Sequence, residues 1–408
     1  MMTIDIREKL PILKEISPRL VLGHIMRAGS ISRADIARLT GFHRSTITRI
    51  VAALLEEGFV EESGEGDSGL GRKPVMLSLV PDAVHIMGVA IESTFVAGVL
   101  VDFNAQIIER IEVPLRDSSR DAVMTDVYWV IDSLLERARA REITVLGIGV
   151  ALHGIVNSDQ GLSVFAPAIE WRNEPVAANI QNKYDLPVRM DNNANAMALG
   201  ESWFGYGQAV ENILVVKVGS SIGSGVILGG RLFPGTNYSA GEIGHLTVLP
   251  GGPRCKCGNF GCLETVASID AILTRGRELL KKGEGKSLRQ FTRDGERLSF
   301  EQLCQATLAR DSVALRLWED VAVYLGLALS YTINILNPAK VLIGGDIFPV
   351  LDYVLPTVRE TVGIQVLPPL KNHLRLEPVG LGQDSVTIGA ATLLLQDIFE
   401  LPKPNGLV

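Results

Sequence analysis

One short, glycine-rich stretch of the sequence holds a cluster of metal-ligand residue types. Between Gly241 and Glu264 lie one histidine and three cysteines, spaced H-x9-C-x-C-x4-C: His245, Cys255, Cys257 and Cys262. Cys3His is a usual ligand set for structural zinc, which prefers tetrahedral thiolate and imidazole ligands. The alternative is three buried or redox cysteines with an unrelated histidine, but the Gly, Pro and Lys neighbours do not favour a buried apolar role. We therefore expect one structural Zn²⁺ ion in this knuckle.

Positive charge is concentrated near the N-terminus of an acidic chain. The 408 residues carry a net charge of −7, yet residues 17–50 contain six arginines and a single acid, Asp35. This segment is therefore +5 and the remainder −12. A basic module on an acidic body fits a DNA-binding head whose other surfaces repel DNA.

The basic segment has the pattern of a winged helix-turn-helix. Helices are expected over 18–29, 33–41 and 43–58, with Ser32 as an N-cap and with Ile36, Ala37 and Leu39 facing inward. Residues 59–80 are expected to form the β-hairpin wing. DNA contacts should come from the start of the last helix and the wing tip. The residues expected to make them are His43, Arg44, Ser45, Thr46, Thr48, Arg49, Arg72 and Lys73.

Beyond residue 81, apolar β-branched runs alternate with helical patterns, which predicts an α/β body. Strands are expected within the runs 85–94, 96–103, 145–156, 212–220 and 339–347. The expected domains are a head over 1–80, a first lobe over 81–195 onto which the C-terminal helix can pack back, and a second lobe over 196–408 with the knuckle 241–264. Cys304 lies on a helical pattern and is expected in the core.

These segments resemble the ROK family (repressor, open reading frame, kinase) across nearly the whole chain, in particular its xylose-repressor-like subgroup. The matching motifs are GRKP at 71–74, DNNAN at 191–195, the zinc stretch, KVLIGGD at 340–346 and LGQDSVTIGAA at 381–391. The resemblance implies a winged helix-turn-helix followed by two actin-like, hexokinase-like α/β lobes of the ROK sugar-kinase type, which bind a sugar.

The sequence departs from the family's kinases where phosphate and protons are handled. Ala90 and Glu92 replace the aspartate and a glycine of the first phosphate motif, and Ser221 replaces a glycine of the second. Asn193 stands where kinases have the aspartate that takes the proton from the attacking hydroxyl. An amide cannot accept that proton, so we expect no enzyme activity. The alternative is that Asp191 substitutes as the base.

The residues that resemble the family's sugar ligands are retained. The expected sugar-binding set is His153, Asn192, Asn193, Glu242, His245 and Glu264. His153 replaces a proline of the kinases, and Ala168 also departs from their pattern. Either departure can change which sugar hydroxyls are recognised. For Glu242 and Glu264 the alternative is a solvated loop charge. One ring nitrogen of His245 can bind zinc while the other faces the sugar.

These observations predict a cytoplasmic, sugar-responsive transcriptional repressor of carbohydrate-metabolism genes, with no membrane association. Its expected partners are a palindromic operator DNA and a sugar effector, with xylose or glucose the best candidate, and the expected assembly is a homodimer or homotetramer. Two alternatives are a bifunctional sugar kinase that also binds DNA, and a repressor sequestered by a partner protein. Asn193 and Glu92 argue against the first, and the retained sugar ligands argue against the second.

Overall fold

The computed structural model describes residues 5–66, 73–292 and 297–399, which fold as two compact units. The first unit runs to residue 196 and includes the C-terminal helix from residue 386, and the second comprises residues 197–385. Each unit has its own hydrophobic core. No helix among the described residues is long and apolar enough to cross a membrane.

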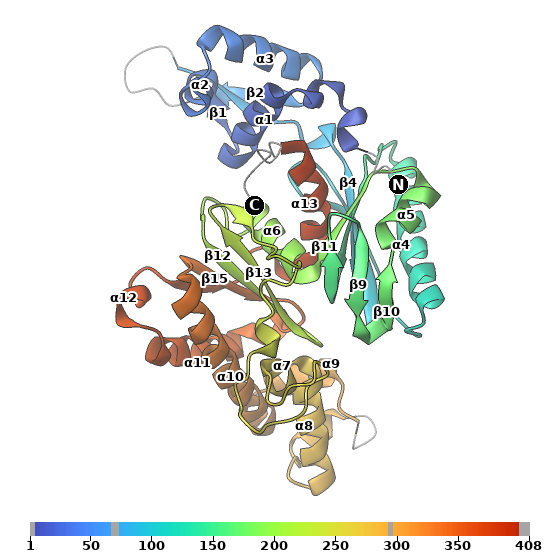
Figure 1. Ribbon diagram of the computed structural model, residues 1–408, viewed down its shortest axis with the longest axis vertical. Coiled ribbons are helices and arrows are strands. Elements are labelled where there is room, and N and C mark those ends of the chain that lie inside the picture. The colour runs from blue at the N-terminus through green and yellow to red at the C-terminus, as the bar shows by residue number, and fades with distance from the viewer. Residues whose placement is uncertain (1–4, 67–72, 293–296, 400–408) are drawn as a thin grey trace. The chain divides into compact units, whose positions relative to one another are not determined.

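The first unit begins with a winged helix-turn-helix (Figure 1). The Ser32 hydroxyl accepts from the Asp35 amide at 3.1 Å, and Gly41 ends the same helix at a φ of 71°. Ile36 is buried, but the expected inward position of Leu39 is wrong: it is 56% exposed, because the inner face of this helix follows residues 33, 36, 37 and 40. The elements are 3-10 turns Ile6–Glu8 and Pro11–Lys14, helices α1 (Ile16–Ala28), α2 (Arg33–Thr40) and α3 (Arg44–Glu56), and strands β1 (Ile31–Ser32), β2 (Val60–Glu65) and β3 (Val75–Leu79), in the antiparallel order β1-β3-β2.

A five-stranded sheet in the order β11-β7-β4-β5-β6 forms the body of the first unit. Its first three strands along the chain are antiparallel neighbours, and β7 and β11 then add in parallel. The bounds are β4 (Ile86–Ile91), β5 (Phe95–Val101), β6 (Ile107–Pro114), β7 (Ile148–Leu152) and β11 (Val188–Asn192). Helices α4 (Arg120–Ala140) and α5 (Val176–Tyr184) pack on it, and α6 (Asn193–Phe204) starts directly after β11.

The C-terminal helix α13 (Ser385–Phe399) lies directly against this sheet. A Cβ atom at Gly88 of β4 would lie 1.9 Å from the Thr387 carbonyl oxygen, and one at Gly149 of β7 would lie 1.7 Å from that of Ala390. Only glycine permits so close an approach of helix and strand backbones. The C-terminal helix α13 is therefore packed into the first unit, against strands β4 and β7.

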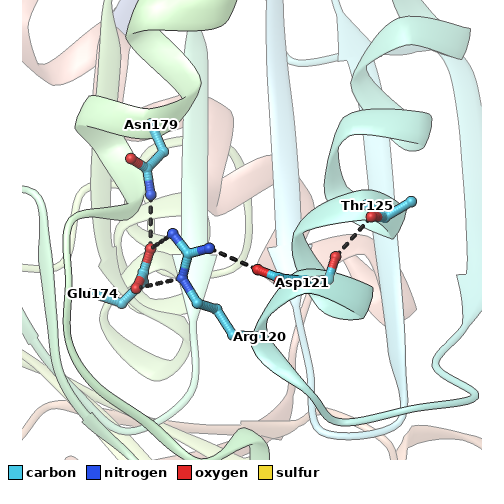
Figure 2. A network of polar contacts seen from close by, with 5 residues as sticks. All are labelled: Arg120, Asp121, Thr125, Glu174 and Asn179. Carbon is cyan, nitrogen blue, oxygen red and sulfur yellow. Dashed lines mark hydrogen bonds and ion pairs between the residues drawn. The ribbon is translucent and has the colours of Figure 1, made fainter.

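A small antiparallel sheet follows β7 and is fixed by a polar network. It consists of β8 (Ile155–Asn157), β9 (Leu162–Ala166) and β10 (Trp171–Glu174). Figure 2 shows that Arg120, at the start of α4, donates two hydrogen bonds of 2.7 and 2.8 Å to Glu174, which also accepts from Asn179 Nδ2 at 2.7 Å. Such a paired contact of guanidinium and carboxylate restricts both distance and orientation. The network ties the end of the small sheet to α4 and α5.

The sheet of the second unit repeats the strand connections of the first. Its order is β14-β13-β12-β15-β16, again three antiparallel neighbours followed by two parallel additions. The expected pair of actin-like α/β lobes is confirmed. The elements are strands β12 (Ile213–Val218), β13 (Ile222–Leu228), β14 (Arg231–Leu232), β15 (Lys340–Gly344) and β16 (Arg375–Pro378), and helices α7 (Leu263–Ala267), α8 (Ile269–Lys282), α9 (Phe300–Leu308), α10 (Ser312–Leu336), α11 (Leu351–Gln365) and α12 (Pro368–Lys371).

Candidate functional site

The histidine and three cysteines of the knuckle converge in the second unit. Their ligand atoms, one from each residue, all lie within 4.8 Å of one another. Cys255 Sγ is 3.6 Å from His245 Nδ1, and Cys257 Sγ is 3.7 Å from Cys262 Sγ. Four ligands at about 2.0 to 2.3 Å around a tetrahedral ion would be separated by comparable distances. The cluster has the geometry of a metal site.

The local backbone and the thiol chemistry both fit a cation at this cluster. Gly261 has a φ of 67°, and a Cβ atom there would lie 1.7 Å from the Leu249 carbonyl oxygen, so the tight knuckle requires glycine. Burial raises the pKa of Cys255 and, with the neighbouring thiols, raises that of Cys262 to about 12. A divalent cation is the group that would stabilise these thiols as thiolates.

Two carboxylates lie near the histidine of this cluster. His245 directs Nδ1 to the cysteines, and its other ring nitrogen, Nε2, lies 3.9 Å from Glu242 Oε2. The pKa values of Glu242 and Glu264 are both raised, mainly by desolvation. The nearby His245 opposes this rise in each case but does not cancel it. The structure therefore brings the three second-unit residues of the expected sugar set together around one imidazole ring.

The first-unit residues of the expected sugar set lie at the ends of two neighbouring strands, β7 and β11, and Glu92 follows the next strand of the sheet, β4. Ile91 of β4 pairs with Leu152 of β7, which pairs with Asn192 of β11. The next residue on each chain segment is Glu92, His153 or Asn193, so these three side chains form one row at the edge of the sheet. All three are buried, and Asn193 Nδ2 donates to the two oxygens of Glu92 at 3.1 and 3.2 Å.

Asn192 and Asp191 mainly serve the protein's own structure. Asn192 Nδ2 donates to the Gly154 carbonyl at 2.7 Å, and its Oδ1 accepts from the Ala194 amide at 2.8 Å. Asp191 Oδ1 accepts from the Asn192 amide at 2.6 Å and from Asn195 Nδ2 at 2.9 Å. Burial raises the pKa of Asp191 to about 6. These contacts fix the turn between β11 and α6.

Sequence reasoning missed two charged residues at the turn between β12 and β13, which holds the second phosphate-motif segment. Lys217 is buried near the end of β12, and a Cβ atom at Gly219 would lie 2.5 Å from Asp346 Oδ2 and 3.3 Å from Lys217 Nζ. Lys217 is the only charged residue in the apolar run 212–220, and this was the signal in the sequence that could have found it. The turn joins β12 and β13, which occupy in the second sheet the positions that β4 and β5 occupy in the first. It is therefore equivalent to the turn that carries Glu92.

In the head, the start of α3 presents most of the expected DNA-contacting residues to solvent. His43 is the N-cap, and its Nδ1 accepts from the Ser45 amide at 3.4 Å. Thr46 is partly buried, and Lys73 is exposed in the wing. Arg72 lies outside the described residues. The residues exposed in this turn and the next are His43, Arg44, Ser45, Thr48 and Arg49.

Four of the six arginines counted in the basic segment do not belong to that surface. Arg19 is buried, and Arg27 Nε donates to the Gly23 carbonyl at 2.9 Å. Arg33 and Arg38 form ion pairs of 2.8 and 2.9 Å with Glu62 and Asp35, respectively. The positive charge available on α3 is therefore that of two arginines, Arg44 and Arg49, which is less than the sequence count implies.

Comparisons with known proteins agree with this combination of head and body. Residues 86–397 match the ROK family, and residues 19–68 match the MarR family. The chain is 31% identical over 393 residues to a putative xylose repressor from Caldicellulosiruptor sp. (strain Rt8B.4), covering 96% of this chain and 98% of that protein. It is also 31% identical over 322 residues to a glucokinase from Halalkalibacterium halodurans, covering 78% and 97%.

A solved structure extends the likeness to the whole chain. The crystal structure of a ROK family transcriptional regulator, a homolog of the E. coli MLC protein, superposes with a TM-score of 0.79 at 27% identity, covering 95% of this chain and 97% of that one. The fold and sites thus define a helix-turn-helix protein with a sugar-kinase-like body. The chain belongs to the ROK family.

Proposed function

We propose that this chain is a transcriptional repressor whose kinase-like body binds a sugar without phosphorylating it. The chain is a sugar-responsive, DNA-binding repressor, in keeping with its head and its family. The observation that carries the further claim of inactivity is the contact between Glu92 and Asn193 at 3.1 to 3.2 Å. It joins the two positions at which the sequence departs most from the kinases.

The residues at the strand ends of the first unit support the loss of phosphoryl transfer. Asn193 cannot take a proton from a sugar hydroxyl, and a positioned base contributes about 10² to 10⁴ in rate. Asp191, the alternative base, lies two residues before Asn193 on β11, and its Oδ1 accepts from the Asn192 amide and from Asn195. It is therefore committed to the turn.

Both turns that carry phosphate motifs now hold a carboxylate. Glu92 is buried at the turn after β4, and the Asp346 carboxylate lies against Gly219 at the turn after β12. A negative charge beside a phosphate-binding turn opposes the charge of ATP phosphates, which such turns cradle with backbone N–H groups. Of these two carboxylates, Glu92 is a departure from the kinases. Asp346 belongs to the matching KVLIGGD segment and lies with the buried Lys217 against Gly219, so the change that disfavours ATP is Glu92.

We assign the metal cluster to a structural zinc ion held by His245, Cys255, Cys257 and Cys262. Four protein ligands leave no open position, as is usual for structural zinc sites. The contact of His245 Nδ1 with Cys255 leaves Nε2 on the side of Glu242, so the ion would fix the ring whose other edge faces the sugar. Glu242 and Glu264 are then carboxylate partners for sugar hydroxyls.

For DNA, the exposed start of α3 is the surface expected to enter the major groove, with Arg44 and Arg49 as its positive charges. A palindromic operator and a homodimer follow from the usual use of helix-turn-helix heads in pairs. The xylose repressor among the relatives makes xylose, or glucose, the first effector to test.

A chain of aromatic contacts joins the head to the body within the first unit. Phe59, just before the wing, packs edge-on against Phe103 at 6.5 Å between ring centroids, and Phe103 stacks on Phe399 at 5.7 Å. Phe399 is the last residue of α13, whose first turns contact the sheet at Gly88 and Gly149. A shift of α13 along this sheet would reach the wing directly, which gives the sugar a physical route to the operator.

Two assays test this function. Thermal-shift screening against monosaccharides, with D-xylose and D-glucose included, should find at least one stabilising sugar. With that sugar and ATP, ADP release should not exceed background, whereas the Halalkalibacterium halodurans glucokinase serves as a positive control on glucose. ADP release that depends on sugar and disappears in Asn193→Ala would refute the claim of inactivity.

A further inference from the structure

The buried pair of Glu92 and Asn193 has a consequence for ligand recognition as well as for catalysis. An ionised carboxylate offers only acceptors, so the group of Asn193 that faces Glu92 must be its NH₂. The oxygen and nitrogen of an amide occupy opposite branches of one planar group. Asn193 Oδ1 is therefore turned away from Glu92.

The geometry points to Glu92 as a positioning residue that determines sugar specificity: by holding Asn193 Nδ2, it makes Asn193 a hydrogen-bond acceptor toward the ligand. This inference rests on the proposed sugar-binding function of the row at the strand ends. It specifies the group that Asn193 recognises: a sugar hydroxyl that donates a hydrogen bond to it.

Burial makes this orientation strongly preferred. Glu92 and Asn193 are each 5% exposed, so water has little access to rescue a reversed amide. A reversed amide would set Oδ1 against the carboxylate, and leaving such buried acceptors unsatisfied would disfavour the reversed form by about 5-fold to 150-fold. The amide therefore acts as a fixed acceptor.

His153, the middle residue of the row, offers the ligand the same hydrogen-bonding character. Its Nδ1 lies 3.3 Å from the Ile91 carbonyl oxygen, which can only accept, so Nδ1 carries the proton. In the neutral ring the lone pair is then on Nε2. Two neighbouring side chains of the row are thus set as acceptors, and a site built in this way selects donors.

Deoxyfluoro sugars test this assignment, because fluorine replaces a hydroxyl without being able to donate. Affinities for D-glucose, D-xylose and their mono-deoxyfluoro derivatives would be measured by calorimetry for wild-type protein. At one ring position the fluorine should weaken binding by about 10-fold or more. In Glu92→Gln, the new side-chain amide can donate to Asn193 Oδ1 and let Nδ2 turn to the ligand, so the penalty at that position should shrink several-fold.

Glu112→Gln, at an exposed glutamate of β6, is the matched control and should keep the wild-type penalty. A merely structural role for Glu92 would weaken hydroxyl and fluoro sugars by the same factor in Glu92→Gln. That result, or a fluorine tolerated at every position by wild-type protein, would overturn the inference.

A second arm needs no ligand. In Asn193→Asp, two carboxyl groups would lie at hydrogen-bond distance, and one of them should have a raised pKa. Its contribution to stability is then complete at low pH and lost as pH rises, so Tm should fall from pH 5 to pH 8 more steeply than in wild-type protein. Adding Glu92→Gln should restore the wild-type slope. Asp191, whose pKa is raised to about 6, and His153 lie near this pair, but they are present in all these variants.

Equal slopes for the single and double variants would show that Glu92 does not face residue 193, and would overturn the inference. If none of the sugars binds wild-type protein, the proposed function fails together with the assigned ligand, whereas the pH arm still decides whether Glu92 holds the Asn193 amide.

Discussion

The two units of this protein share one sheet topology but differ in the polar clusters that they hold. In the second unit, His245 and three cysteines of the segment between β14 and α7 bring their ligand atoms within 4.8 Å of one another. In the first unit, a row of buried side chains follows the strand ends, and within it Asn193 Nδ2 donates to the Glu92 carboxylate.

The comparison distinguishes a frame of strands and turns from the few side chains that the frame presents. The frame depends on backbone positions, such as Gly88 and Gly149 beneath α13, and on local caps such as Asn192 at the start of α6. Catalysis depends on a few side chains placed on that frame. In the proposed function, changes at those side chains remove a base and add a charge while the strands that present them stay in place.

The largest effect is expected when the cluster of the second unit is broken. Cys257→Ser should lose the metal, because zinc in a four-ligand structural site contributes an apparent binding free energy of about 10 to 16 kcal/mol in small zinc domains. Elemental analysis of protein purified without chelator should fall from one zinc per chain to none, with a large drop in Tm. Cys304→Ser, at a buried cysteine outside the cluster, should retain the metal. Wild-type protein without zinc would contradict the assignment.

The next effect concerns the buried carboxyl of the first unit. Burial raises the pKa of Asp191 from 3.8 to about 6, so its protonated form stabilises the fold at low pH and this stability is lost as pH rises through about 6. The loss is at most about 3 kcal/mol in unfolding free energy. Asp191→Asn keeps an acceptor oxygen for Asn192 and Asn195 and should flatten this dependence between pH 4 and pH 8. Denaturant unfolding would measure it, with Glu136→Gln as an exposed control; parallel pH profiles for wild-type protein and Asp191→Asn would contradict the account.

A smaller effect is expected at the aromatic contacts between head and body. Phe399→Ala removes the ring that stacks on Phe103, and we expect a loss of about 1 to 2 kcal/mol in stability for a half-buried ring. The more specific expectation is that the effect of sugar on operator affinity shrinks while sugar affinity stays the same. Phe233→Ala, at an exposed ring of the second unit, is the control. An unchanged sugar effect in Phe399→Ala would exclude this route.

The smallest effect is expected at the polar network of Figure 2. Arg120 is 52% exposed, and exposed ion pairs contribute about 0 to 1 kcal/mol, so Arg120→Met should lower Tm only slightly. The loss should still exceed that of Arg110→Met, because the Glu112 carboxylate with which Arg110 pairs is more exposed than that of Glu174. Thermal melts at low and high salt would compare the two variants, and an equal or larger loss in Arg110→Met would show that the network adds nothing.

The features that could be predicted from the sequence are those set by neighbouring residues. Ser32 and Gly41 limit α2 as expected because capping depends on a few adjacent backbone groups. The metal cluster could be predicted because its four ligands lie within 18 residues and zinc accepts few other arrangements. The α/β body followed from alternating strand and helix patterns, and its division into two lobes followed from the resemblance to the ROK family.

The features that could not be predicted depend on long-range packing. The count of arginines over residues 17–50 overstated the positive charge exposed on α3, because burial of Arg19 and the pairing of Arg33 with Glu62 require the folded head. The hydrogen bond between Glu92 and Asn193 joins positions 101 residues apart, and only the order of strands β11-β7-β4 brings them into one row. Neither relation leaves a local pattern in the sequence.

The central claim is that sugar binding and operator binding are coupled, and one measurement tests it directly. A mobility-shift titration at fixed salt, with and without the sugar found by screening, should show operator affinity changed by about 5-fold to 150-fold, and operator DNA should change sugar affinity by the same factor. Glu242→Ala should abolish the response and leave operator binding intact, whereas Arg44→Ala should weaken operator binding and leave sugar affinity in the absence of DNA unchanged. A sugar that binds tightly and leaves operator affinity unchanged would contradict the account.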